Sequence, residues 1–94
     1  MHKETKATPD GKIHVQRVQT GVRIEKRLLK VLKALAGYFD ITLGDLLEGI
    51  VLHAFDGKSP FTTGETLQRI ADLKRIYGAD YDSSASHNFI EEGR

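Results

Sequence analysis

The side chains with the clearest chemical potential lie in one short stretch, residues 16–24. Alternate positions of this stretch hold mostly polar residues: Arg17, Gln19, Gly21 and Arg23. Arginine can form two parallel hydrogen bonds with guanine, and glutamine can do the same with adenine. We therefore expect this stretch to contact the base edges of DNA, chiefly through Arg23 and Gln19. The simpler alternative is that these polar residues only keep an exposed surface hydrated.

The positions between them are apolar or β-branched: Val18, Thr20, Val22 and Ile24. Because a β-strand places alternate side chains on opposite faces, this pattern predicts a strand. It is the one convincing strand in the sequence, and a lone strand leaves its backbone donors and acceptors without partners. A second copy of the chain is the simplest partner. We therefore expect a homodimer joined by an intermolecular antiparallel β-ribbon.

Three helices are expected to follow this strand. Apolar residues recur at helical spacing over residues 25–38, with lysine and arginine on the other side. Thr42 is a suitable N-cap for a second helix, to about residue 55, whose wide apolar face favours burial against a second chain. A third helix is predicted over 64–77, with Gly78 as its C-terminal stop. The expected fold class is thus mostly α with one β-strand.

Composition divides the chain into four segments. The last of them lacks a helical period and has few core-forming residues, so we expect it to be disordered when free. Its apolar side chains could bind a protein partner: Tyr81, Phe89 and Ile90. The four segments are a flexible basic arm (1–14), the strand with two helices (15–56), a turn with the third helix (57–78) and the tail (79–94).

Charge is distributed unevenly along the chain. Residues 1–37 hold nine Lys or Arg against three Asp or Glu, a net charge of +6, whereas residues 38–94 hold five against ten, a net charge of −5. Such asymmetry indicates a basic surface for a polyanion, although helix surfaces are also often charged in blocks. There is no cysteine and no apolar run of membrane-spanning length, so we expect a soluble cytoplasmic protein.

The order and spacing of these elements resemble the ribbon-helix-helix family of dimeric DNA-binding proteins. The resemblance covers roughly residues 17–55. Two departures from the family pattern stand out: Gly21 replaces a polar side chain at the central base-reading position, and Asp40 replaces a glycine in the turn between the helices. The residues that carry the resemblance are 19–24 in the strand, Leu28, Leu29, Leu32, Leu35 and Ala36 in the first helix, and Thr42, Leu43, Leu46, Leu47 and Ile50 in the second.

The resemblance implies specific roles for these positions. The β-ribbon would enter the major groove and the start of the second helix would bind a phosphate, and two dimers could occupy adjacent sites. A bacterial member would be associated with the nucleoid. The implied base contacts are Gln19, Gly21 and Arg23. The implied phosphate contacts are Thr42, Leu43 and Gly44. Arg17 and Lys26 are expected to neutralise further phosphates, and the expected dimer core is Val22, Ile24, Leu32, Leu46, Leu47 and Ile50.

The function expected from these observations is that of a sequence-specific transcriptional regulator, most simply a repressor. An antitoxin-type autorepressor whose tail binds a toxin, and a dimeric protein-interaction adaptor without DNA binding, are the alternatives. We expect no enzymatic activity, because so short a core offers no set of acid, base and nucleophile. No metal or other cofactor is expected either, since the four histidines lie far apart in the sequence.

Overall fold

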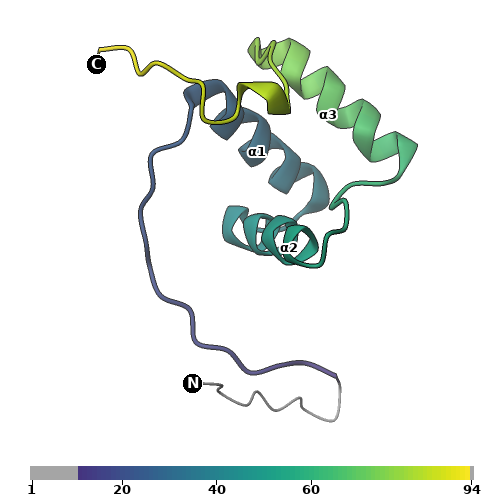
Figure 1. Ribbon diagram of the computed structural model, residues 1–94. Coiled ribbons are helices and arrows are strands. Elements are labelled where there is room, and N and C mark those ends of the chain that lie inside the picture. The colour runs from purple at the N-terminus through teal and green to yellow at the C-terminus, as the bar shows by residue number, and fades with distance from the viewer. Residues whose placement is uncertain (1–10, 94) are drawn as a thin grey trace.

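The computed structural model describes residues 11–93, and most of the predicted basic arm, residues 1–10, lies outside this range. Three α-helices make up the body of the molecule: α1 (Lys26–Phe39), α2 (Leu43–Phe55) and α3 (Gly64–Tyr77). A short 3-10 helix, η1 (Ser83–Ala85), follows in the C-terminal segment. Helix α1 lies between the other two, and residues 11–25 run along the outside of the molecule (Figure 1).

The predicted β-ribbon is wrong for this chain. Among residues 11–93 there is no β-strand or sheet, and residues 14–25 carry no regular secondary structure. Alternation of apolar and polar residues describes the two faces that a strand would have, but it cannot provide a hydrogen-bonding neighbour. The described part of the chain contains no such neighbour. The predicted fold class, a ribbon-helix-helix homodimer, is therefore corrected to a fold of three helices.

Helix α1 begins and ends through specific caps. Glu25 is the N-cap, and its carboxylate accepts hydrogen bonds from the amides of Arg27 and Leu28 at 3.0 and 3.2 Å. Asp40 ends the helix in the left-handed conformation, with φ 58° and ψ 44°. Aspartate tolerates this region better than most residues, so the turn to α2 forms without the glycine usual at such a position.

The other two helices start at threonine N-caps, of which Thr42 was predicted from the sequence. The hydroxyl of Thr42 accepts a hydrogen bond from the amide of Asp45 at 3.1 Å, and that of Thr63 accepts one from Thr66 at 3.2 Å. Gly78 adopts a φ of 71° at the end of α3, which a residue with a side chain rarely adopts. The predicted bounds of all three helices are confirmed to within one residue.

The core is small and lies where α1 meets the other helices. Leu35 is 1% exposed and packs with Ala36 of α1 and Leu46 of α2. Half-buried side chains complete this cluster: Leu32, Ile50, Phe61, Ile70 and Leu73. Within residues 11–93, no helix combines the length and the apolar character that crossing a bilayer would require.

Candidate nucleic-acid interface

The segment predicted to contact bases is extended and exposed. Gln19, Gly21 and Arg23 all lie on the surface, and open space surrounds the position that a Cβ atom of Gly21 would occupy. Two apolar residues of the same segment are exposed too, since Val18 is 83% and Val22 is 73% accessible, whereas Ile24 is half-buried. The two faces of the pattern therefore do not correspond to an inner and an outer surface of a single chain. This leaves the side chains of Gln19 and Arg23, which were predicted to contact bases, accessible to a ligand.

Arg17 is held against α2 by a bidentate ion pair. Its Nε and Nη2 atoms donate to the two carboxylate oxygens of Glu48 at 2.9 and 2.8 Å. The hydrogen bond with Glu48 and the charge of that carboxylate raise the pKa of the Arg17 guanidinium. The same hydrogen bond and the positive charge of Arg17 lower the pKa of Glu48. Both side chains remain largely exposed to solvent. Arg17 thus presents to a carboxylate the same planar fork that could bind a phosphate.

Arg23 also has a carboxylate partner. Its Nη2 atom donates to Glu91, which lies in the C-terminal segment 68 residues further along the chain. The pair joins the extended segment to the tail on the outside of the molecule, and each of the two side chains is about two-thirds exposed. A ligand that binds Arg23 through the same guanidinium nitrogen therefore has to displace Glu91.

Three lysines on α1 differ from these arginines. Lys26, Lys30 and Lys33 are exposed, and no carboxylate in residues 11–93 forms an ion pair with them. Arg27 on the same helix already has a hydrogen-bond partner, since its Nη1 atom donates to the carbonyl of Gly78 at 3.1 Å. The three lysines are thus the basic side chains of α1 that remain accessible to an anionic ligand.

The start of α2 combines free donors with negative charge. The amides of Leu43 and Gly44 have no hydrogen-bond partner in the described part of the chain, as expected for the first turn of a helix. The Thr42 hydroxyl is used as the cap, and Asp45 occupies the first turn. Because Asp45 and Glu48 oppose an anion here, this helix start can bind a phosphate only with the help of a cation such as Arg17.

Glu25 links the extended segment to the tail. Besides capping α1, it accepts a hydrogen bond from the hydroxyl of Tyr81. Partial burial would raise the pKa of Glu25, but hydrogen bonds from Tyr81, from the amides of Arg27 and Leu28 and from the Arg27 side chain lower it to about 2. Burial and the bond to the Glu25 carboxylate raise the pKa of Tyr81 to about 12. Glu25 is thus ionised at neutral pH and fixes the position at which α1 begins.

The residues expected in a dimer core are divided between two environments. Leu46 is buried in the core of the single chain, where Leu32 and Ile50 pack against the same cluster. Leu47 and Ile24 are half-buried, whereas Val22 is exposed. Three of the six residues therefore serve the monomer core directly.

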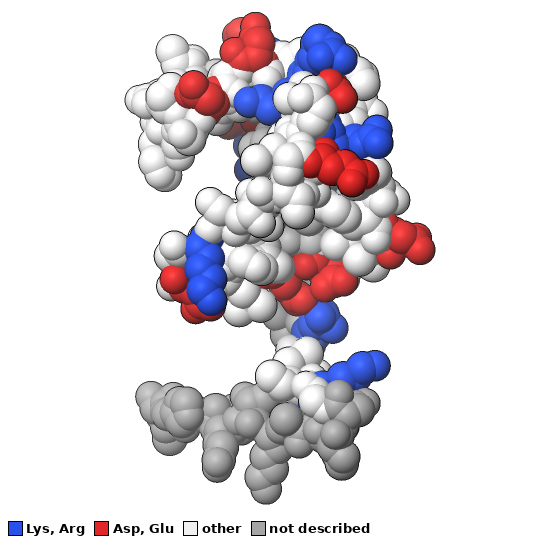
Figure 2. All heavy atoms as spheres, turned by 90° about the vertical axis from the view of Figure 1, so that its right-hand side faces the viewer, with Lys and Arg blue, Asp and Glu red and all other residues white. Residues whose placement is uncertain are grey.

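Charges of both signs are interspersed on the face that includes α3, which Figure 2 shows. Arg69 lies over the ring of Tyr38 with 4.5 Å between its Cζ atom and the ring centroid, and Arg75 pairs with Asp72 at 3.2 Å. This face therefore presents no surface of a single sign, in contrast to the lysines of α1.

The contacts of the C-terminal segment were not predicted from the sequence. Glu91 reaches Arg23, Tyr81 reaches Glu25, and Asp80 lies 3.6 Å from Arg27. All three pairs join residues more than 50 positions apart, and no local pattern signals them. The prediction that residues 79–94 are disordered when free stays a prediction.

Comparison of the chain with protein-family models, with curated proteins and with solved structures found no match.

Proposed function

We propose that this protein is a sequence-specific DNA-binding regulator of transcription that acts as a repressor by occupying its site. One observation carries the proposal: the first 37 residues have a net charge of +6, and the described cations among them lie largely on the surface. An exposed set of arginines and lysines favours a polyanionic ligand, because neutralising phosphates releases condensed counterions. The rest of the chain is acidic, and its carboxylates Glu48 and Glu91 pair with arginines of the basic half.

Phosphate and base contacts would come from different residues. Lys26, Lys30 and Lys33 have no competing carboxylate in the described part of the chain and supply affinity without sequence preference. Arg23 and Gln19 supply preference, because each can pair with a base edge through two hydrogen bonds. Arg17 and the free amides of α2 would share one phosphate. Exposed ion pairs are weak, so a phosphate or guanine can replace Glu48 or Glu91 at little cost.

A homodimer is supported by the apolar surface that a single chain leaves open. At the end of α2, Leu52 is 63% and Phe55 is 82% exposed. Contiguous exposed apolar side chains usually mark an interaction site. Two chains joined through α2 would double the number of phosphate contacts and give the bound site dyad symmetry, and two such dimers could occupy adjacent sites.

The experiment that tests DNA binding is a fluorescence-anisotropy titration of duplex DNA over a range of salt concentrations. The triple variant Lys26→Gln, Lys30→Gln, Lys33→Gln is compared with the wild type and with the control Lys58→Gln, which changes a lysine between α2 and α3. We expect the triple variant to bind more weakly. Its plot of log affinity against log salt should be less steep, by about 0.9 for each lost phosphate contact. Equal slopes for all three proteins would contradict the proposal.

An autorepressor whose C-terminal segment also binds a second protein is the alternative with a specific observation behind it. Ile90 is 92% exposed and lies next to Glu91, which pairs with Arg23 of the extended segment proposed to bind DNA. Binding of a partner there would remove Glu91 from Arg23 and couple the two interactions. Protection of Phe89 and Ile90 from proteolysis by a co-expressed partner would support this function, and unchanged cleavage in its presence would oppose it.

A further inference from the structure

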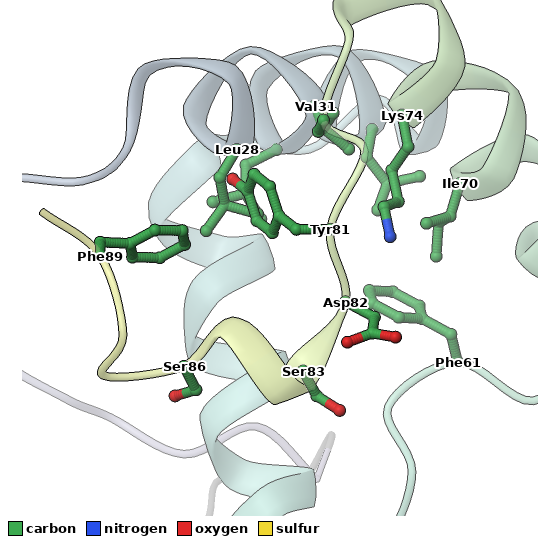
Figure 3. A pocket seen from close by; sticks show the side chains of 13 residues that line it. Leu28, Val31, Phe61, Ile70, Lys74, Tyr81, Asp82, Ser83, Ser86 and Phe89 are labelled. Carbon is green, nitrogen blue, oxygen red and sulfur yellow. The ribbon is translucent and has the colours of Figure 1, made fainter.

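An apolar cavity lies between α1, α3 and the C-terminal segment (Figure 3). Its volume is about 370 Å³, which falls within the range of about 300–1,000 Å³ common for small-molecule sites. One wall is the C-terminal segment, where the rings of Tyr81 and Phe89 pack edge to face with centroids 5.1 Å apart. The other walls are side chains of the helices and of the α2–α3 loop: Leu28, Val31, Leu32, Leu35, Phe61 and Ile70.

One cation lies at the rim of this cavity. Lys74 lines it from α3, and in Figure 3 its amine points into the space between Ile70 and Asp82. The neighbouring carboxylate of Asp82 accepts hydrogen bonds from the hydroxyl and the amide of Ser84 at 2.6 and 2.9 Å, and these bonds, together with the charge of Lys74, lower the pKa of Asp82. No carboxylate in residues 11–93 forms an ion pair with Lys74. The rim therefore places a cation above the apolar walls, outside ion-pair distance of the described carboxylates but within the field of Asp82.

We propose that this cavity binds a small amphipathic carboxylate, with its apolar chain against Leu28, Val31 and Ile70 and its carboxylate on Lys74. Burying apolar surface is favourable, so the apolar walls of this pocket favour an occupant with an apolar chain. A single cation beside Asp82 matches one negative charge better than the double charge of a phosphate ester. The proposal concerns a second site and does not depend on DNA binding.

Octanoate and octan-1-ol are the probes that separate the two parts of the site. Both are titrated into the full-length protein by calorimetry, and we expect saturable binding of each at one site per chain. Hexanoate in place of octanoate removes two methylene groups, and affinity should fall about fourfold for each. The variant Lys74→Gln should weaken octanoate about threefold to fivefold and leave octan-1-ol unchanged. The control Lys33→Gln, a lysine of α1 outside the lining, should change neither.

A cavity-filling variant tests the location. Ile70→Phe adds volume to a half-buried lining residue, and it should reduce binding of both probes at least tenfold. Folding of each variant is checked by circular dichroism, and Lys74→Gln provides the decisive comparison if Ile70→Phe does not fold. Absence of saturable octanoate binding by the folded wild type would overturn the proposal. Equal loss of octanoate and octan-1-ol in Lys74→Gln would also overturn it, because the carboxylate would then not be recognised.

Discussion

The contact between Tyr81 and Glu25 should make a measurable contribution to the free energy of unfolding. Replacing Tyr81 by phenylalanine removes the hydroxyl that donates to Glu25 and leaves the aromatic ring in place. A hydrogen bond to a charged group contributes about 1.5–3 kcal/mol. Because the Glu25 side chain is 21% exposed and stays partly hydrated, we expect the lower end of this range, about 1.5 kcal/mol at neutral pH.

The pH dependence follows from the pKa of Glu25. The carboxyl has a pKa of about 2 in the folded chain against an ordinary value of 4.5, so its ionised form is favoured by folding. This stabilisation is fully present above about pH 4.5 and is lost as the pH falls through about 2. The difference between the two pKa values corresponds to about 3 kcal/mol of net stabilisation by the ionised carboxylate, after the opposing effect of burial is included.

Urea denaturation at fixed protein concentration, at about pH 7, pH 4 and pH 3, measures both effects. Tyr77→Phe is the matched control, because the Tyr77 hydroxyl has no hydrogen-bond partner in the described part of the chain. We expect Tyr81→Phe to lower the free energy of unfolding and Tyr77→Phe to leave it unchanged. In Glu25→Gln, the free energy of unfolding should fall less between pH 4 and pH 3 than it does in the wild type. Wild-type stability in Tyr81→Phe, or an unchanged pH profile in Glu25→Gln, would refute the reasoning.

Three further predictions concern the core, the ion pair between Arg17 and Glu48, and the apolar end of α2. Leu35→Ala should cost about 3 kcal/mol in urea denaturation, whereas Ile76→Ala, at an exposed position, should cost less than about 1 kcal/mol, and equal costs would contradict the assigned core. Glu48→Gln releases Arg17 and removes a negative charge, so DNA affinity should rise about threefold in anisotropy titrations, and a fall would count against the proposed phosphate contact. Leu52→Asp should convert a dimer into a monomer in analytical ultracentrifugation, and an unchanged mass would argue against the α2 interface.

The helices could be predicted from the sequence because their signals are local. Thr42 and Thr63 cap the helices that follow them, and Gly78 ends the last one in a conformation that glycine adopts readily. Apolar residues at helical spacing identified the face of α1 that is buried, including Leu35. Each of these signals lies within about four residues of the feature that it predicts.

The strand was wrongly predicted because pairing is not local. The alternation over residues 17–24 is present, but a strand needs a hydrogen-bonded neighbour, and residues 11–93 provide none. The pairing of Arg23 with Glu91 and the wall that Tyr81 gives to the cavity also join distant parts of the chain. Such contacts depend on how the segment after α3 turns back towards α1, which composition and spacing do not specify.

The most direct test of DNA recognition is selection of bound duplexes from a random pool at near-physiological salt, with the wild type and Arg23→Ala in parallel. Arg75→Ala is the control, since this arginine lies on the face of mixed charge and pairs with Asp72. We expect the wild type and the control to enrich one motif with dyad symmetry and Arg23→Ala to lose preference at defined positions of it. If the folded wild type enriches no motif, or if Arg23→Ala enriches the same motif unchanged, Arg23 does not read bases as proposed.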